Sequence, residues 1–116
     1  MLKVAKEDDR YLVSLFQVSK LNTLFSELIT QQLDQLVRVP DRHVIFNLEG
    51  VRFIDTAGFN TLRRASEISS ANGGTFQVCN IGDEVKELID LTGMNGSLDI
   101  IPRLEVREKI SMELDD

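Results

Sequence analysis

The sequence predicts an α/β fold: a mixed β-sheet of four to five strands with helices packed mainly on one face. Short apolar runs rich in branched and aromatic residues alternate with longer segments in which apolar residues recur every three or four positions. The expected order is strand, strand, helix, strand, helix, strand, helix, strand. Alternating strands and helices of these lengths favour a sheet that contains parallel pairs.

The first part of the chain predicts an antiparallel strand pair followed by a helix. Strands are expected at residues 2–5 and 11–18, because the charged link between them has a length common in hairpins. Residues 19–37 predict an amphipathic helix that Asn22 caps and Pro40 stops. Its apolar positions are Leu21, Leu24, Phe25, Leu28, Leu33 and Leu36.

The central part of the chain predicts a buried strand at residues 44–48, then a short apolar patch and a helix that starts at Asp55-Thr56. This helix should end near Asn72-Gly73-Gly74, because glycine permits the left-handed backbone that commonly closes a helix. One face of the helix is expected to carry Phe59, Leu62, Ala65 and Ser69.

The last part of the chain predicts a strand at residues 75–79 and a helix at residues 83–92, with Asp83 as its cap and Gly93 after its end. A short strand is expected at residues 98–101. Residues 103–114 predict a terminal helix, because Val106, Ile110 and Leu114 repeat every four positions.

Composition sets bounds on the class of protein. A chain of 116 residues is the size of one domain and can bury a core without disulfides or metal. The net charge of −6 argues against a nucleic-acid partner and against docking on anionic membranes. No apolar run approaches the roughly 20 residues that span a bilayer. We therefore expect a soluble, cytoplasmic protein.

The inventory of catalytic groups does not favour an enzyme. His43 is the sole histidine, and Cys79 lies in an apolar run, which predicts a buried residue rather than a nucleophile. Gly73-Gly74 lacks the lysine and the spacing of a phosphate-binding loop, and residues 93–96 lack the third glycine of a dinucleotide fingerprint. We expect no enzymatic activity, cofactor or metal, so binding and regulation become the leading class.

Asp55 and Thr56 carry two interpretations. Either residue can simply cap the helix, since a cap needs only a short side chain with an oxygen. The hydroxyl of Thr56 also lies where unpaired backbone N–H groups and the positive end of the helix dipole gather, a place that tolerates a phosphate. Spacing alone leaves both interpretations open.

Three ordered blocks within residues 44–101 resemble the STAS domains of bacterial anti-sigma factor antagonists. Residues 44–59 read VIFNLEGVRFIDTAGF, which resembles the family's strand, link and Asp-Ser/Thr-Ser/Thr/Ala-Gly signature. Residues 71–78, ANGGTFQV, resemble the family's helix end with paired glycines before a strand, and residues 85–94, VKELIDLTGM, resemble its third helix. The resemblance implies a single STAS domain over residues 1–116.

The resemblance also implies a partner switch. An unmodified antagonist binds an anti-sigma factor, often a serine/threonine kinase of the histidine-kinase-like ATPase type, and so frees a sigma factor. The kinase phosphorylates the hydroxyl residue directly after the motif aspartate, here Thr56, and a phosphatase restores it. The implied partner surface comprises Asp55, Thr56, Ala57, Gly58, Phe59, Asn60, Arg63, Arg64 and Ser19.

The sequence departs from the family pattern in two places. Residues 16–19 lack the glycine and both acids of the family's Gly-Glu-(Leu/Ile/Val)-Asp stretch, and Ala57 removes the second hydroxyl that many members carry.

The alternative function is that of a non-switching STAS scaffold subunit of a sensory complex or of an ABC-type lipid transporter, in which Thr56 matters only as a cap or a contact.

Overall fold

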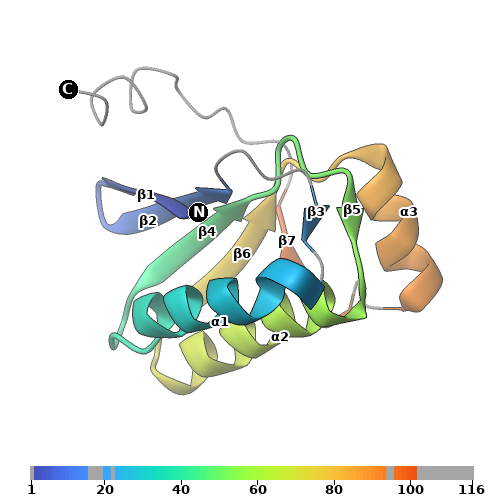
Figure 1. Cartoon of the computed structure of the whole chain (residues 1–116). Helices are drawn as coiled ribbons and strands as arrows, with labels where there is room; N and C mark the ends of the chain where they lie inside the picture. Colours follow the sequence, from blue (N-terminus) through green and yellow to red (C-terminus); the bar gives the residue numbers. More distant parts are fainter. Residues whose placement is uncertain (1, 16–19, 22, 94–95, 102–116) are drawn as a thin grey trace.

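A five-stranded mixed sheet in the order β1-β2-β4-β6-β7 forms the centre of the structure (Figure 1). This computed structural model describes residues 2–15, 20–21, 23–93 and 96–101. β1 and β2 are antiparallel, whereas β2, β4, β6 and β7 run parallel to one another. The predicted opening hairpin and the mixed sheet are confirmed. The strands are β1 (Leu2–Glu7), β2 (Arg10–Leu15), β4 (His43–Asn47), β6 (Thr75–Cys79) and β7 (Asp99–Ile100).

Three helices follow parallel strands, as predicted: α1 (Thr23–Val37), α2 (Thr56–Ala71) and α3 (Asp83–Thr92). α1 and α2 lie side by side along one face of the sheet, and α3 lies beyond β7 and β5 (Figure 1). Asp34 of α1 forms an ion pair with Arg64 of α2 at 3.1 Å, so the two helices are also joined at their outer surface. None of the helices in the described residues is both long and apolar enough to cross a membrane.

The main core lies between the sheet and this pair of helices. Phe46 of β4 and Phe76 of β6 pack edge to face, with ring centroids 6.2 Å apart. The predicted face of α2 is confirmed, because Phe59, Leu62, Ala65 and Ser69 are all buried. A smaller cluster of Leu12, Ile45 and Cys79 packs separately from the main core, and Cys79 is buried as predicted.

The predicted face of α1 is partly wrong. Leu28 was expected on the buried side but is 46% exposed, whereas Ile29 and Val37 are buried together with Leu33. Apolar residues occur on several sides of this helix, and its contacts with both the sheet and α2 decide which of them are enclosed.

A second, two-stranded parallel sheet was not predicted. β3 (Lys20–Leu21) pairs with β5 (Phe53–Ile54). Because β3 comes first, α1 begins at Thr23 rather than at Ser19. Ser19 and Asn22 lie outside the described residues, as does the terminal helix predicted at residues 103–114.

The ends of α2 and α3 follow the glycine pattern. Asn72 ends α2, and Gly73 has a φ of +79°. Gly74 lies so close to the backbone of Arg42 that a β-carbon there would collide with it. Gly93 closes α3 in the left-handed conformation, as predicted.

The start of α3 differs from the prediction. Asp83 was expected to cap this helix, but the cap position is Gly82, and Asp83 is the first helical residue.

Candidate functional site

The junction between β5 and α2 holds the candidate site. Asp55 has an extended backbone, and its Oδ1 accepts a hydrogen bond from the backbone N–H of Gly58 at 2.9 Å. Asp55 is therefore the N-cap, one of the two residues that the sequence allowed for this role. Thr56 is the first residue of the helix, and its side chain is exposed.

The beginning of α2 is held firmly to the rest of the fold. Thr61 is buried, and its hydroxyl donates to the backbone oxygen of Ala57 at 3.0 Å. The same hydroxyl lies 2.9 Å from the hydroxyl of Thr30 on α1. Since a hydroxyl carries one hydrogen, Thr30 must be the donor in that second bond. The first turn is thus fixed to α1, and Thr56 is presented on a rigid element.

Three of the predicted site residues share one exposed stripe of α2. Thr56, Asn60 and Arg63 are spaced by four and three residues, which places them on one helix face, and all three are exposed. Arg63 donates from Nη2 to Oδ1 of Asn60 at 3.2 Å. This contact directs the guanidinium toward the N-terminal end of the helix, where Thr56 lies.

Other predicted contact residues take different places. Phe59 is only 3% exposed and packs in the core, so the expectation that its side chain contacts a partner is corrected. Gly58 is also buried, Ala57 is half-buried, and Ser19 lies outside the described residues. Arg64 is exposed, but its guanidinium pairs with Asp34. Phe59 faces inward because it shares the apolar side of the helix with Leu62 and Ala65, which are also buried.

Phe53 is a further candidate contact residue, which the sequence did not predict. Phe53 lies in β5, three residues before Thr56, and its side chain is 43% exposed, whereas that of Ile54 is buried. Alternation in a strand of only two residues carries little signal. An exposed aromatic ring beside an exposed hydroxyl gives the junction an apolar component that favours protein contact.

The histidine and the cysteine, the two side chains considered for catalysis, have structural roles. Nδ1 of His43 lies 2.9 Å from the hydroxyl of Thr75 on the neighbouring strand. Burial raises the pKa of the Cys79 thiol from 9.0 to about 11, the Glu49 carboxylate adds to this, and Arg10 opposes it. Within the part of the chain that the structure describes, no three histidine, cysteine or acidic side chains are grouped to hold a metal ion.

The sequence model of the STAS domain family matches residues 4–108. The chain belongs to the STAS domain family. A curated relative, an anti-sigma F factor antagonist from Paenibacillus polymyxa, is 22% identical over 94 residues, which cover 80% of each chain.

Solved structures share this STAS fold. An anti-sigma-factor antagonist (STAS) domain protein from Planctomyces limnophilus matches with a TM-score of 0.78 at 19% identity, covering 99% of this chain and 98% of that one. SpoIIAA, an anti-sigma factor antagonist and Bacillus cell fate determinant, matches in its unphosphorylated form with a TM-score of 0.63 at 16% identity, covering 99% and 96% of the two chains. Its phosphorylated form matches with a TM-score of 0.59 at 13% identity, covering both chains fully.

Proposed function

We propose that this STAS domain is an anti-sigma factor antagonist that binds an anti-sigma factor through the beginning of α2, and that phosphorylation of Thr56 opposes the complex. The observation that carries the proposal is the exposed hydroxyl of Thr56 at the first position of α2, directly after the capping Asp55. The antagonist function of the Paenibacillus relative and the two phosphorylation states of SpoIIAA support the same class.

The beginning of α2 is suited to a phosphate. The capping Asp55 occupies the N–H of Gly58, but the first turn of α2 contains no further acid, so the helix dipole and the other backbone N–H groups near Thr56 still favour an anion. Arg63 is directed along the same stripe toward Thr56. The free protein can therefore accept the group without unfolding the helix.

The same phosphate would oppose docking of a partner. It adds about 1.5 to 2 negative charges and three acceptor oxygens, next to the carboxylate of Asp55. Burying that charge beneath a partner carries a desolvation cost, and the exposed ring of Phe53 would no longer lie in an apolar contact. A loss of about 3 kcal/mol corresponds to roughly 150-fold weaker binding.

The proposed partner is a kinase-type anti-sigma factor that uses ATP, and a phosphatase would reverse the modification. The STAS domain then acts as substrate and binding module rather than as an enzyme, in the cytoplasm and in control of transcription. A scaffold subunit would use the same surface without modification, so the state of Thr56 separates the two functions.

The test uses the full chain and candidate anti-sigma kinases from the same genome. The parent, incubated with kinase and Mg-ATP, should gain one phosphate at Thr56 by intact mass and peptide sequencing. Thr56→Ala should gain none. Ser70→Ala, which removes an exposed hydroxyl at the other end of α2, is the matched control and should behave as the parent. Equal modification of Thr56→Ala and the parent would falsify the acceptor assignment.

Binding is measured in parallel by titration calorimetry. Thr56→Asp should bind the kinase roughly 100-fold more weakly than the parent, because it places a carboxylate on the docking surface. Tight binding without any modification would instead favour the scaffold function. Failure of every candidate kinase to bind would contradict the antagonist role itself.

A further inference from the structure

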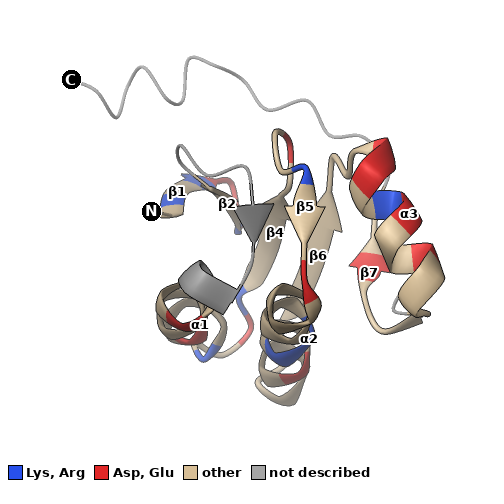
Figure 2. Ribbon diagram, turned by 45° about the vertical axis from the view of Figure 1, so that its right-hand side comes forward, with Lys and Arg blue, Asp and Glu red and all other residues tan. Residues whose placement is uncertain are grey.

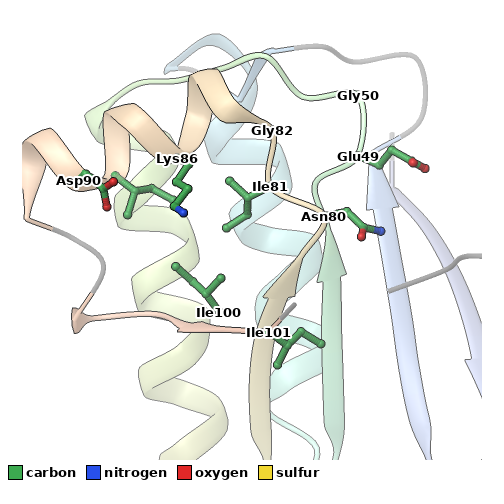
Figure 3. Close-up of a pocket in the computed structure, with 10 residues that line it drawn as sticks. Glu49, Gly50, Asn80, Ile81, Gly82, Lys86, Asp90, Ile100 and Ile101 are labelled. Carbon is green, nitrogen blue, oxygen red and sulfur yellow. The ribbon is translucent and has the colours of Figure 1, made fainter. Parts of the chain in front are cut away.

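A cavity of about 600 Å³ lies away from the α2 junction, between α3 and the ends of β6 and β7. The pieces of chain around it come from the link after β4, the link between β6 and α3, α3 itself and β7 (Figure 3). Four isoleucines give it an apolar wall: Ile81, Ile89, Ile100 and Ile101. Binding sites for small molecules commonly have volumes of about 300 to 1,000 Å³.

The wall of this cavity is a stable part of the fold. Ile89 is 1% exposed and belongs to the main core, and Ile81 packs against the same core. Ile100 is held in β7, which pairs with β6, and Ile101 donates its backbone N–H to the oxygen of Val78 at 3.0 Å. The cavity is therefore preformed and does not require a loop to close.

One cation, the exposed Lys86 of α3, lines this largely apolar cavity. The amine of Lys86 points from α3 toward Ile81 and Ile100 (Figure 3). Among the described residues, Lys86 forms no ion pair, although acids are abundant on α3 (Figure 2). A cation directed at apolar side chains, rather than at a nearby carboxylate, is suited to an anionic group on an otherwise apolar ligand.

Two acids limit how much negative charge the cavity accepts. Glu49 and Asp90 lie at opposite ends of it, on either side of Lys86, and the carboxylate of Glu49 points away from the amine (Figure 3). A ligand with several negative charges would meet repulsion from both acids. A ligand with one negative charge satisfies Lys86 alone.

We propose that this cavity binds a small monocarboxylate with an apolar body of roughly six to twelve carbon atoms, whose carboxylate pairs with Lys86. The apolar body lies against the isoleucines. The site is separate from Thr56, and the inference does not rest on the proposed antagonist function.

The test titrates sodium octanoate into the full ¹⁵N-labelled chain, below the concentration at which it forms micelles. Saturable amide shifts are expected in residues 80–90 and 99–101, and not at Thr56. Hexanoate should bind about tenfold more weakly, because burying two methylene groups contributes that factor. Adenosine triphosphate, a polyanion, should not compete.

Charge variants on the exposed surface of α3 make the test specific. Lys86→Gln should weaken octanoate binding about five- to tenfold while leaving binding of neutral octanol unchanged. Lys6→Gln, on β1, is the matched control and should behave as the parent. Asp90→Asn should strengthen octanoate binding, whereas it would weaken binding of a cationic or zwitterionic ligand.

Three results would overturn the proposal. One is the absence of saturable shifts with octanoate. Another is equal affinity of the parent and Lys86→Gln for octanoate. The third is preferential binding of octylamine or phenylalanine, which would assign the site to the acids instead.

Discussion

The beginnings of α2 and α3 differ although each helix follows a strand end. α2 has a side-chain cap, Asp55, and no acid in its first turn. α3 begins after Gly82, which makes no side-chain cap hydrogen bond, and its first turn carries Asp83 and Glu84. At α3 two acids compensate the positive end of the helix dipole, whereas at α2 only the capping Asp55 does, so an added negative charge at Thr56 meets one carboxylate rather than two.

The surroundings reinforce this difference. Glu84 of α3 forms an exposed ion pair with Arg52 at 3.4 Å, so the acids of α3 are also engaged by the neighbouring link. Thr56 of α2 has no acid after it in its turn and comes three residues after the exposed Phe53. Two helix starts with the same backbone geometry thus offer different surfaces, one suited to modification and docking and one not.

The largest expected effect concerns how firmly each helix is held. Phe59→Ala should lower the free energy of unfolding by about 3–5 kcal/mol, because it removes a ring that is 3% exposed from the core beneath the α2 junction. Leu91→Ala on α3 should change it by less than about 0.5 kcal/mol, since Leu91 is 76% exposed. Urea denaturation of both variants measures the difference, and equal losses would contradict the packing described for the two helices.

Cys79 ends the strand that leads to α3, and it contrasts with Thr56 in accessibility. Its burial and its raised pKa of about 11 should make alkylation by iodoacetamide at least roughly 100-fold slower than that of a free cysteine. The rate is measured by intact mass at pH 8, with and without urea. Labelling as fast in the native protein as in urea would show that this strand end is open.

The same thiol gives a pH dependence of stability. The folded state holds the thiol protonated up to about pH 11, whereas the unfolded state ionises near pH 9.0. The unfolded state therefore binds fewer protons between these values, and the free energy of unfolding should fall as pH rises from 9 toward 11. Cys79→Ala should remove this contribution, and denaturation curves at pH 8 and 10 compare the two proteins.

Removing the cap of α2 should have a smaller effect. Asp55→Ala should lower the free energy of unfolding by about 1 kcal/mol, because the N–H of Gly58 loses its acceptor. Asp55→Asn retains a side-chain oxygen and should cost little. Thermal denaturation of the two variants separates the hydrogen bond from the charge, and similar losses in both would assign the effect to charge instead.

Adding a cap to α3 should have the smallest effect. Gly82→Ser should raise the free energy of unfolding by a few tenths of a kcal/mol, since serine can accept from the first turn where glycine cannot. The space exists, because a β-carbon on Gly82 would have only the backbone oxygen of Val51 near it, at 4.0 Å. Gly82→Ala has the same β-carbon without the oxygen and should be less stable than the parent. Equal stabilities would show that solvent already satisfies this helix end.

Local patterns predicted the parts of the fold that local physics controls. The strands of the main sheet, the buried face of α2 and the glycine-rich ends of α2 and α3 could be read directly, because each depends on residues close in sequence. The helix start at Asp55-Thr56 was also found this way, whereas the role of Thr56 came only from the resemblance to STAS domains. Helical periodicity placed Phe59 on the buried face with Leu62, and the family resemblance also placed it on the partner surface; its burial agrees with the periodicity.

Nonlocal contacts account for what the sequence did not predict. The pairing of β3 with β5 joins segments about thirty residues apart and involves two residues on each side, too few to produce a pattern. Leu28 and Ile29 are adjacent and similar in hydrophobicity, so only the positions of α2 and the sheet decide that Leu28 is exposed and Ile29 buried. The apolar cavity combines four separate segments and has no sequence signature.

The sequence by itself determined the α/β class, the order of the three helices and of the strands of the main sheet, and the helix start at Asp55-Thr56. Those properties follow from apolar periodicity, glycine conformation and capping chemistry, which act over a few residues. The tertiary structure decided that Leu28 is exposed while Ile29 is buried, and that Lys86 lines a largely apolar cavity. Exposure and cavity lining depend on which segments lie alongside, and packing of the whole chain sets those neighbours.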